Sequence, residues 1–198
     1  LLATSDPEVA EVARSLRSHA MTSGTWDRHR AGAADYDVIG TGFNYRLDEP
    51  RAALLSSRLR RLGDEVAERR RLTRRYRELL AELDGVLVPY TDDQVATSSC
   101  YTMPVLIANP SLREPVRRRL WDEHRVQTSV LYPALSQLSA YRDDGPGLPR
   151  CERIAASQLS LPLHPGLGEE RVERVVAALA ESLAAAQRRG AALSSSSE

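Results

Sequence analysis

The chain has 198 residues, and its hydrophobic content of 42% and charged content of 27% are typical of a globular protein with a buried core. Its 27 basic residues balance 27 acidic ones, so the net charge favours neither nucleic acid nor an anionic membrane as a partner. The sequence has no apolar run near the roughly 20 residues of a membrane span and does not open like a signal peptide, so we expect a cytoplasmic protein without a membrane partner.

The first predicted element is a helix that starts at Asp6 and ends near Ser18. Asp6 can accept hydrogen bonds from free backbone N–H groups, Pro7 suits the first helical position, and apolar side chains recur at helical spacing after them. Residues 1–4 are predicted to end a strand. Residues 19–43 are predicted to form a long loop, of the kind that lines a site or a subunit contact.

The chain is organised around residues 42–62, GFNYRLDEPRAALLSSRLRRL. The Gly-Phe-Asn-Tyr-Arg turn concentrates polar groups that can hold an anion, and Asp48 marks the start of a helix. The apolar spacing predicts one helix over 48–84, or two nearly collinear helices broken near Gly63. Acidic residues interleave with its arginines, which favours a solvated charged face over a nucleic-acid surface.

The rest of the chain predicts a small α/β domain with a mixed or antiparallel sheet and helices over one face. Pro104 indicates an edge position or a bulge within its strand, and Asn109 can cap the helix that follows. Strands are predicted at 86–88, 100–107 and 126–132 with a short extended piece at 160–163, helices at 109–124, 151–159 and 169–187, and a disordered tail at 188–198.

All basic residues are arginine, so no side-chain amine of this chain can form a Schiff base. The two cysteines, Cys100 and Cys151, form neither a disulfide framework nor a metal-ligand spacing. We therefore expect reduced thiols and no metal site.

Five segments occur in the order, and at about the spacing, of one known family. They are LLATSDPEVAEVARSLRSHA, GFNYRLDEPRAALLSSRLRRL, SSCYTMPVLI, HRVQTSVLYPAL and ERIAASQLSLPLHPGL. Through them the chain resembles the C-terminal half of the DegT/DnrJ/StrS sugar aminotransferases, fold-type-I enzymes that use pyridoxal phosphate. The resemblance implies the C-terminal part of that transferase fold, with a remnant of the large domain at 1–47, a connecting helix at 48–84 and a small α/β domain at 85–187.

The resemblance also implies which groups this chain supplies. The family's first half binds most of the pyridoxal phosphate and carries the Schiff-base lysine, so no catalytic residue is assigned here and the segment alone should be inactive. Asn44 matches an asparagine that reaches across a homodimer interface to the cofactor phosphate of the neighbouring subunit. Arg46 matches an arginine at the carboxylate of the amino donor, which a guanidinium fork suits well.

Both assignments have a local alternative. Asn44 could instead occupy a left-handed turn after Gly42. Arg46 could form an ion pair with Asp48 or Glu49.

Three further positions follow from the resemblance. Tyr132 matches a region at the mouth of the active site and is assigned to substrate binding. The family commonly has a histidine in the loop after it, where this chain has Ser136. His19 matches a histidine that the family often places before glycine, and here Ala20 follows it.

The resemblance implies transfer of an amino group from glutamate or glutamine to a keto-sugar, nucleotide-linked, or to a keto-cyclitol, in amino-sugar biosynthesis. Some relatives replace the lysine with histidine and act as sugar dehydratases. A third alternative is a non-catalytic α/β module that dimerises or binds a partner through the long helix. We also expect exposed apolar surface where the missing large domain would pack.

Overall fold

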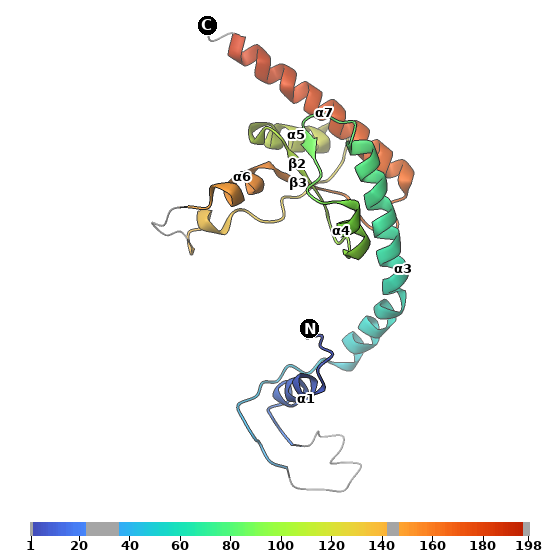
Figure 1. The fold of residues 1–198 in the computed structure, drawn as a ribbon, viewed down its shortest axis with the longest axis vertical. Coiled ribbons are helices and arrows are strands. Elements are labelled where there is room, and N and C mark those ends of the chain that lie inside the picture. Colours follow the sequence, from blue (N-terminus) through green and yellow to red (C-terminus); the bar gives the residue numbers. More distant parts are fainter. Residues whose placement is uncertain (1, 23–35, 142–146, 196–198) are drawn as a thin grey trace. The chain divides into compact units, whose positions relative to one another are not determined.

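The computed structural model describes residues 2–22, 36–141 and 147–195, and the chain forms two compact units, Leu1–Arg60 and Arg61–Glu198. Figure 1 labels the α-helices and the strands β2 and β3. The remaining residues, which include parts of two predicted loops and the end of the predicted tail, lie outside the described ranges. Within those ranges no helix is both long enough and apolar enough to cross a membrane.

The first unit begins with helix α1, Pro7–Leu16, which confirms the predicted helix. The Asp6 carboxylate accepts hydrogen bonds from two N–H groups of the first turn, at 2.8 and 3.3 Å. The apolar side chains of α1 remain exposed, with 44% of Val9, 58% of Val12 and 38% of Leu16 accessible to solvent. The expected exposed apolar surface is therefore present on this helix.

Helix α3, Glu49–Leu80, starts in the first unit and continues without a break through Gly63 into the second. One helix is therefore present, rather than two. The Asp48 carboxylate caps it by accepting the N–H of Arg51 at 3.0 Å. Its arginines form the ion pairs expected of a charged helix face, namely Arg69 with Glu65, Arg71 with Glu68 and Glu169, Arg75 with Glu78 and Glu173, and Arg77 with Asp92.

The second unit is built on an antiparallel sheet in the order β1-β2-β3. The strands are β1, Val86–Leu87, β2, Met103–Ile107, and β3, Gln158–Leu161. Val86 lies opposite Ile107, and Val105 lies opposite Leu159. Of the two sheet types predicted, the antiparallel one is therefore found.

The strand predicted at 126–132 is wrong. Only Ser129 pairs with the sheet, exchanging backbone hydrogen bonds of 3.1 and 2.7 Å with Ser160. Two residues later the Leu131 N–H donates to the Gln158 side chain at 3.2 Å. A side chain thus takes the hydrogen bond that a neighbouring strand would need to continue the ladder.

The edge position predicted from Pro104 is also wrong for the strand as a whole, because β2 is the central strand. The register explains why proline is tolerated there. Pro104 lies opposite Ser160, whose own N–H and C=O point away to Ser129, so the Pro104 nitrogen faces the other side of β2. On that side β1 has already ended at Leu87, so the missing N–H removes no ladder hydrogen bond.

The helices of the second unit confirm three predictions and correct two. The tail at 188–198 was predicted to be disordered, but helix α7 continues to Ser195. The reason is an alanine-rich stretch that favours helix. Helix α4 was missed, although Thr91 and Gln94 form a capping box at its start. The bounds are α4, Asp92–Thr97, α5, Pro110–Asp122, a 3₁₀ turn η1, Leu135–Gln137, α6, Pro149–Ser157, and α7, Glu169–Ser195.

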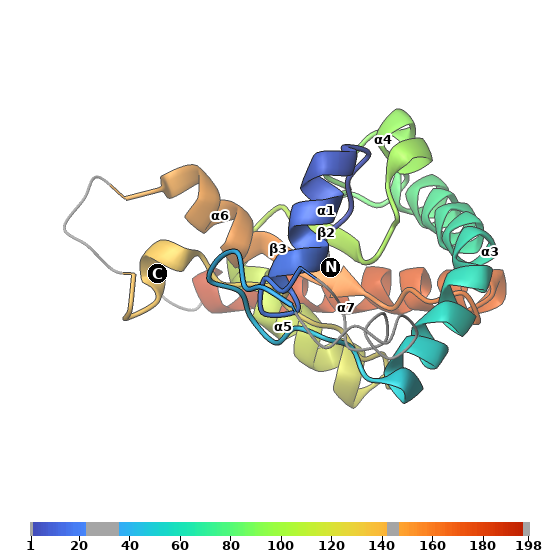
Figure 2. The same ribbon diagram turned by 90° about the horizontal axis from the view of Figure 1, so that it is seen from below.

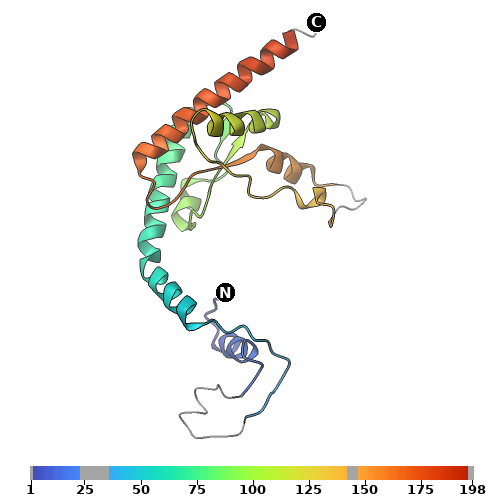
Figure 3. The same cartoon turned by 180° about the vertical axis from the view of Figure 1, so that it is seen from behind.

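One hydrophobic core joins β2 and β3 to helices α3, α5 and α7. The strands lie between α6 and the C-terminal part of α3 in the views of Figure 1 and Figure 2. Figure 3 shows the start of α7 beside α3, where the ion pairs of Arg71 and Arg75 connect the two helices. Fully buried members include Leu72, Tyr76, Met103, Val105, Ile107, Val116, Leu120, Leu159, Val172 and Leu179.

Replacing Tyr76 with phenylalanine should destabilise the second unit. The buried Tyr76 hydroxyl donates to the carbonyl oxygen of Pro162 at 2.9 Å, so Tyr76→Phe leaves that carbonyl without its donor. We expect a loss of about 1–2 kcal/mol in the free energy of unfolding, measured in urea. Tyr101→Phe, at an 81% exposed position, is the matched control. Equal stability of the two variants would contradict this account.

The same tyrosine should make the stability depend on pH in the alkaline range. Burial raises the pKa of Tyr76 above its ordinary value of 10.0, so the folded state keeps a proton that the unfolded chain loses. The stabilisation is therefore complete below pH 10 and is lost as the pH rises above it. In urea unfolding, the free energy of unfolding should fall less between pH 9 and pH 11 for Tyr76→Phe than for the parent. Parallel curves for the two proteins would contradict this prediction.

Candidate functional site

Residues 42–46, which we call the Asn44 segment, pair along their backbone with the end of α1. Three hydrogen bonds of 2.7, 2.9 and 2.8 Å hold the segment there, from Phe43 N to Leu16 O, from His19 N to Phe43 O and from Tyr45 N to Arg17 O. The segment is therefore extended, and its side chains alternate between two sides.

Gly42 permits this close approach. A Cβ atom on Gly42 would lie 2.3 Å from the backbone nitrogen of Ala20 and 2.4 Å from the carbonyl carbon of His19. These two residues turn the chain with φ angles of 55° and 63°, in the left-handed region that favours glycine. His19 thus contributes its backbone to the site, while its side chain is exposed.

Asn44 and Arg46 are exposed on one side of the segment. The Arg46 Nε donates to the Asn44 Oδ1 at 3.0 Å, so the amide NH₂ and the other guanidinium N–H groups remain as donors. The backbone of Asn44 does not adopt the left-handed conformation. The carboxylate of Asp48 pairs with Arg51 at 3.2 Å, rather than with Arg46. Neither local alternative from the sequence is therefore found among the described residues.

Phe43 and Tyr45 lie on the opposite side of the Asn44 segment. Their rings stack with centroids 5.1 Å apart and an interplanar angle of 7°. They are 52% and 72% exposed, so they form an apolar surface suited to packing against another protein surface. This pair was not predicted from the sequence, although the alternation of aromatic and polar residues is the signal of an extended segment.

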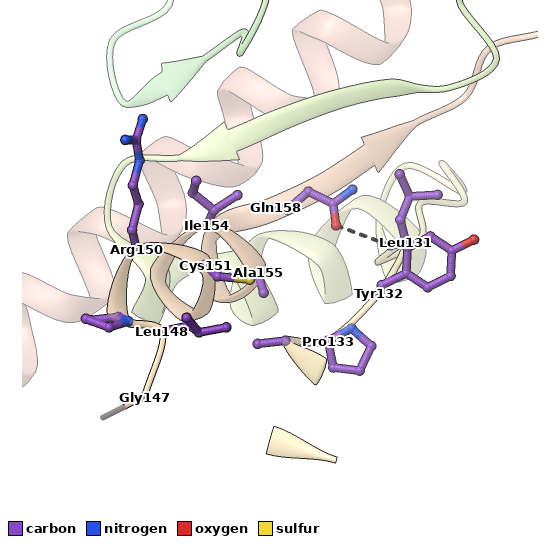
Figure 4. A pocket seen from close by; sticks show the side chains of 12 residues that line it. Leu131, Tyr132, Pro133, Gly147, Leu148, Arg150, Cys151, Ile154, Ala155 and Gln158 are labelled. Carbon is purple, nitrogen blue, oxygen red and sulfur yellow. Dashed lines mark hydrogen bonds between the residues drawn. The ribbon is translucent and has the colours of Figure 1, made fainter. Parts of the chain in front are cut away.

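Tyr132 lies in the second unit, on the wall of an open groove of about 730 Å³. Figure 4 shows the groove between residues 131–134 and the start of α6, with apolar side chains such as Leu148 and Ile154 on its walls. Tyr132 is 76% exposed. The Gln158 amide oxygen, which accepts the Leu131 N–H, fixes the segment that carries Tyr132.

Glu152 connects the two walls of this groove. The Ser136 hydroxyl donates to Glu152 Oε1 at 2.8 Å, and the Leu148 N–H donates to the same oxygen at 3.3 Å. Cys151, an exposed free thiol, also lines the groove. The contact of Glu152 could not be predicted from the sequence, because Ser136, its partner, lies in a separate segment of the chain.

The fold of this chain is also found in solved structures of aminotransferases. The aminotransferase TlmJ of Streptoalloteichus hindustanus is 35% identical with a TM-score of 0.75, and the match covers 92% of this chain and 47% of that one. The PLP-form of the putative sugar aminotransferase Spr1654 of Streptococcus pneumoniae, 19% identical with a TM-score of 0.75 over 92% of this chain and 45% of that one, shows the fold alone.

A curated relative points to the same class. The dTDP-4-dehydro-2,3,6-trideoxy-D-glucose 4-aminotransferase of Saccharopolyspora spinosa is 34% identical over 173 residues, which are 86% of this chain and 44% of the relative. The chain spans about half the length of the relatives that it matches.

The fold is thus that of one part of a pyridoxal-phosphate-dependent transferase, as the sequence segments predicted. The chain belongs to the DegT/DnrJ/EryC1/StrS aminotransferase family, whose profile matches residues 1–180.

Replacing Gly42 with alanine should detach the Asn44 segment from α1, because the new methyl group overlaps backbone atoms that cannot move aside. We expect hydrogen exchange at the amides of Phe43 and His19 to accelerate by about tenfold or more, measured by NMR. Gly40→Ala is the matched control, since its Cβ would meet only the Ala20 methyl group at 3.9 Å. Unchanged exchange in Gly42→Ala would show that the segment is held in another way.

Proposed function

We propose that this chain is the C-terminal part of an aminotransferase that passes an amino group from glutamate or glutamine to a nucleotide-linked keto-sugar, with a keto-cyclitol as the other substrate class, in the cytoplasm. In this proposal residues 1–47 complete a large domain, 48–84 connect it to the rest, and 85–187 form the small domain. The name of the Saccharopolyspora spinosa relative, an aminotransferase of a dTDP-keto-sugar, supports the substrate class.

The observation that carries the proposal is the pair of exposed anion donors on the Asn44 segment. The hydrogen bond between Arg46 and Asn44 orients both side chains and uses only one N–H of the guanidinium. What remains is an amide NH₂ and a guanidinium edge side by side, on a backbone held by three hydrogen bonds. Such a set fits the phosphate and carboxylate groups of pyridoxal phosphate and an amino acid.

Pyridoxal phosphate, when bound, supplies the electron sink that amino-group transfer needs. Asn44 donates to its phosphate in the neighbouring subunit of a homodimer, while the rest of the cofactor site lies on the part of the protein outside this chain. Arg46 binds the carboxylate of the amino donor with two parallel hydrogen bonds. Tyr132 and its groove bind the sugar substrate.

Exposed apolar surface on the first unit supports the proposal that another part of the protein, a large domain, packs on it. The side chains of Val9, Val12 and Leu16 on α1 are accessible, as are the stacked rings of Phe43 and Tyr45. A large domain that packs on these side chains would bury them and would favour association of the two parts by the hydrophobic effect.

Because the chain contains no lysine, it should not form a side-chain Schiff base alone. The chain is incubated with pyridoxal phosphate, treated with borohydride and mapped by peptide mass spectrometry. We expect no adduct at any side chain. A reduced adduct on an internal peptide would overturn the assignment of the reactive lysine to the part outside this chain.

The roles of Asn44 and Arg46 can be tested in a chimera that joins the first half of the Saccharopolyspora spinosa enzyme to this chain. Asn44→Ala should weaken retention of pyridoxal phosphate about tenfold, followed by its visible absorbance after dialysis. Arg46→Gln should lower kcat/KM for the amino donor roughly tenfold to hundredfold through the loss of a charged hydrogen bond.

Arg51→Gln is the matched control for this experiment, since it removes the same charge a few residues away and breaks only the exposed pair with Asp48. The proposal fails if Arg46→Gln and Arg51→Gln have equal kinetics. It also fails if Asn44→Ala retains the cofactor as well as the parent chimera does.

A further inference from the structure

A second groove in the Arg61–Glu198 unit shares no lining residue with the groove of Tyr132. It has a volume of about 360 Å³ and lies between residues 124–127, which follow α5, and α7. These two helices lie side by side in Figure 1 and Figure 3. We call it the arginine groove, because Arg125, Arg171 and Arg174 line it.

These three arginines differ from Arg117, Arg118 and Arg119 on the neighbouring helix α5, each of which has a carboxylate partner. Across the described residues, none of the three has a carboxylate within the 4.0 Å of an ion pair. By contrast, Arg71 pairs with Glu68 and Arg117 pairs with Glu114. The lining of the arginine groove therefore carries three guanidinium groups and one carboxylate, that of Glu181, which leaves an excess of positive charge.

The backbone at Arg125 is unusual. Its φ angle is 55°, and its N–H donates to the Trp121 carbonyl at 3.1 Å, in the turn that ends α5. Helices commonly give such a left-handed position to glycine, since a Cβ atom is strained there. The guanidinium of Arg125 lies 5.9 Å from the centre of the Trp121 ring, which holds the side chain in place.

The other lining groups complete an amphiphilic site. The His124 Nε2 atom is buried without a hydrogen-bond partner, and the nearest carboxylate, that of Glu181, is 3.8 Å away. Val126, Leu167 and Val175 give the groove an apolar floor. A ligand that is complementary to this groove has an anionic group at one end and an apolar or planar group at the other.

We propose that the arginine groove binds an organic diphosphate. Guanidinium forks match the oxygens of a phosphoryl group, and a chain of two phosphates can reach more than one of the three arginines. The organic group lies on the apolar floor. This site is independent of Asn44 and Arg46 and would persist if the proposed aminotransferase activity were absent.

The test uses isothermal titration calorimetry on the chain at fixed ionic strength, with inorganic phosphate, pyrophosphate and thymidine 5′-diphosphate as separate probes. We expect thymidine 5′-diphosphate to bind more tightly than pyrophosphate, and pyrophosphate more tightly than phosphate. Arg171→Gln and Arg174→Gln should each weaken the binding of both diphosphates about tenfold. Arg118→Gln, which removes the same charge from α5 outside the groove, should leave the affinities unchanged.

Arg125→Gly separates a binding role from a structural one. Glycine relieves the left-handed backbone, so this variant should raise the melting temperature and weaken diphosphate binding about tenfold. The proposal is overturned if the groove variants bind diphosphates like the parent, or if Arg118→Gln loses as much affinity as they do. Equal affinity for pyrophosphate and thymidine 5′-diphosphate would overturn the role of the apolar floor.

Discussion

The position of the anion donors depends on how closely two backbone segments approach at Gly42. With no side chain there, the turn at His19 and Ala20 lies against the Asn44 segment, at a distance that no other residue would allow. The three hydrogen bonds to the end of α1 then fix which side chains face which side. The donors and the stacked aromatic rings are thus two faces of one extended segment, and a single steric condition places both.

Local signals were enough to predict most helices. Asp6 and Asn109 cap their helices through hydrogen bonds to the first turn, and such contacts depend only on residues a few positions apart. The missed helix α4 had a signal of the same kind in Thr91 and Gln94. The false strand at 126–132 failed for a non-local reason, because its hydrogen bonding is decided by Gln158, which no local pattern identifies.

For the candidate site, the sequence predicted individual residues but not the contacts between them. Asn44 and Arg46 were singled out from a short motif, but their mutual hydrogen bond was not, since Asp48 and Glu49 were equally close candidates for the arginine. The groove of Tyr132 was only partly foreseen. Its opposite wall is the start of α6, and the contact of Ser136 with Glu152 that joins the walls exists only after folding.

The two cysteines differ in a way that has a practical consequence. Cys100 is 5% exposed, whereas Cys151 is open to solvent on the wall of the groove that holds Tyr132. Thiol-directed reagents act on accessible cysteines, so a maleimide dye would attach at one place and leave the other sulfur untouched. The chain therefore carries a natural attachment point for a fluorescent reporter, on the wall of the groove that is proposed to bind the sugar.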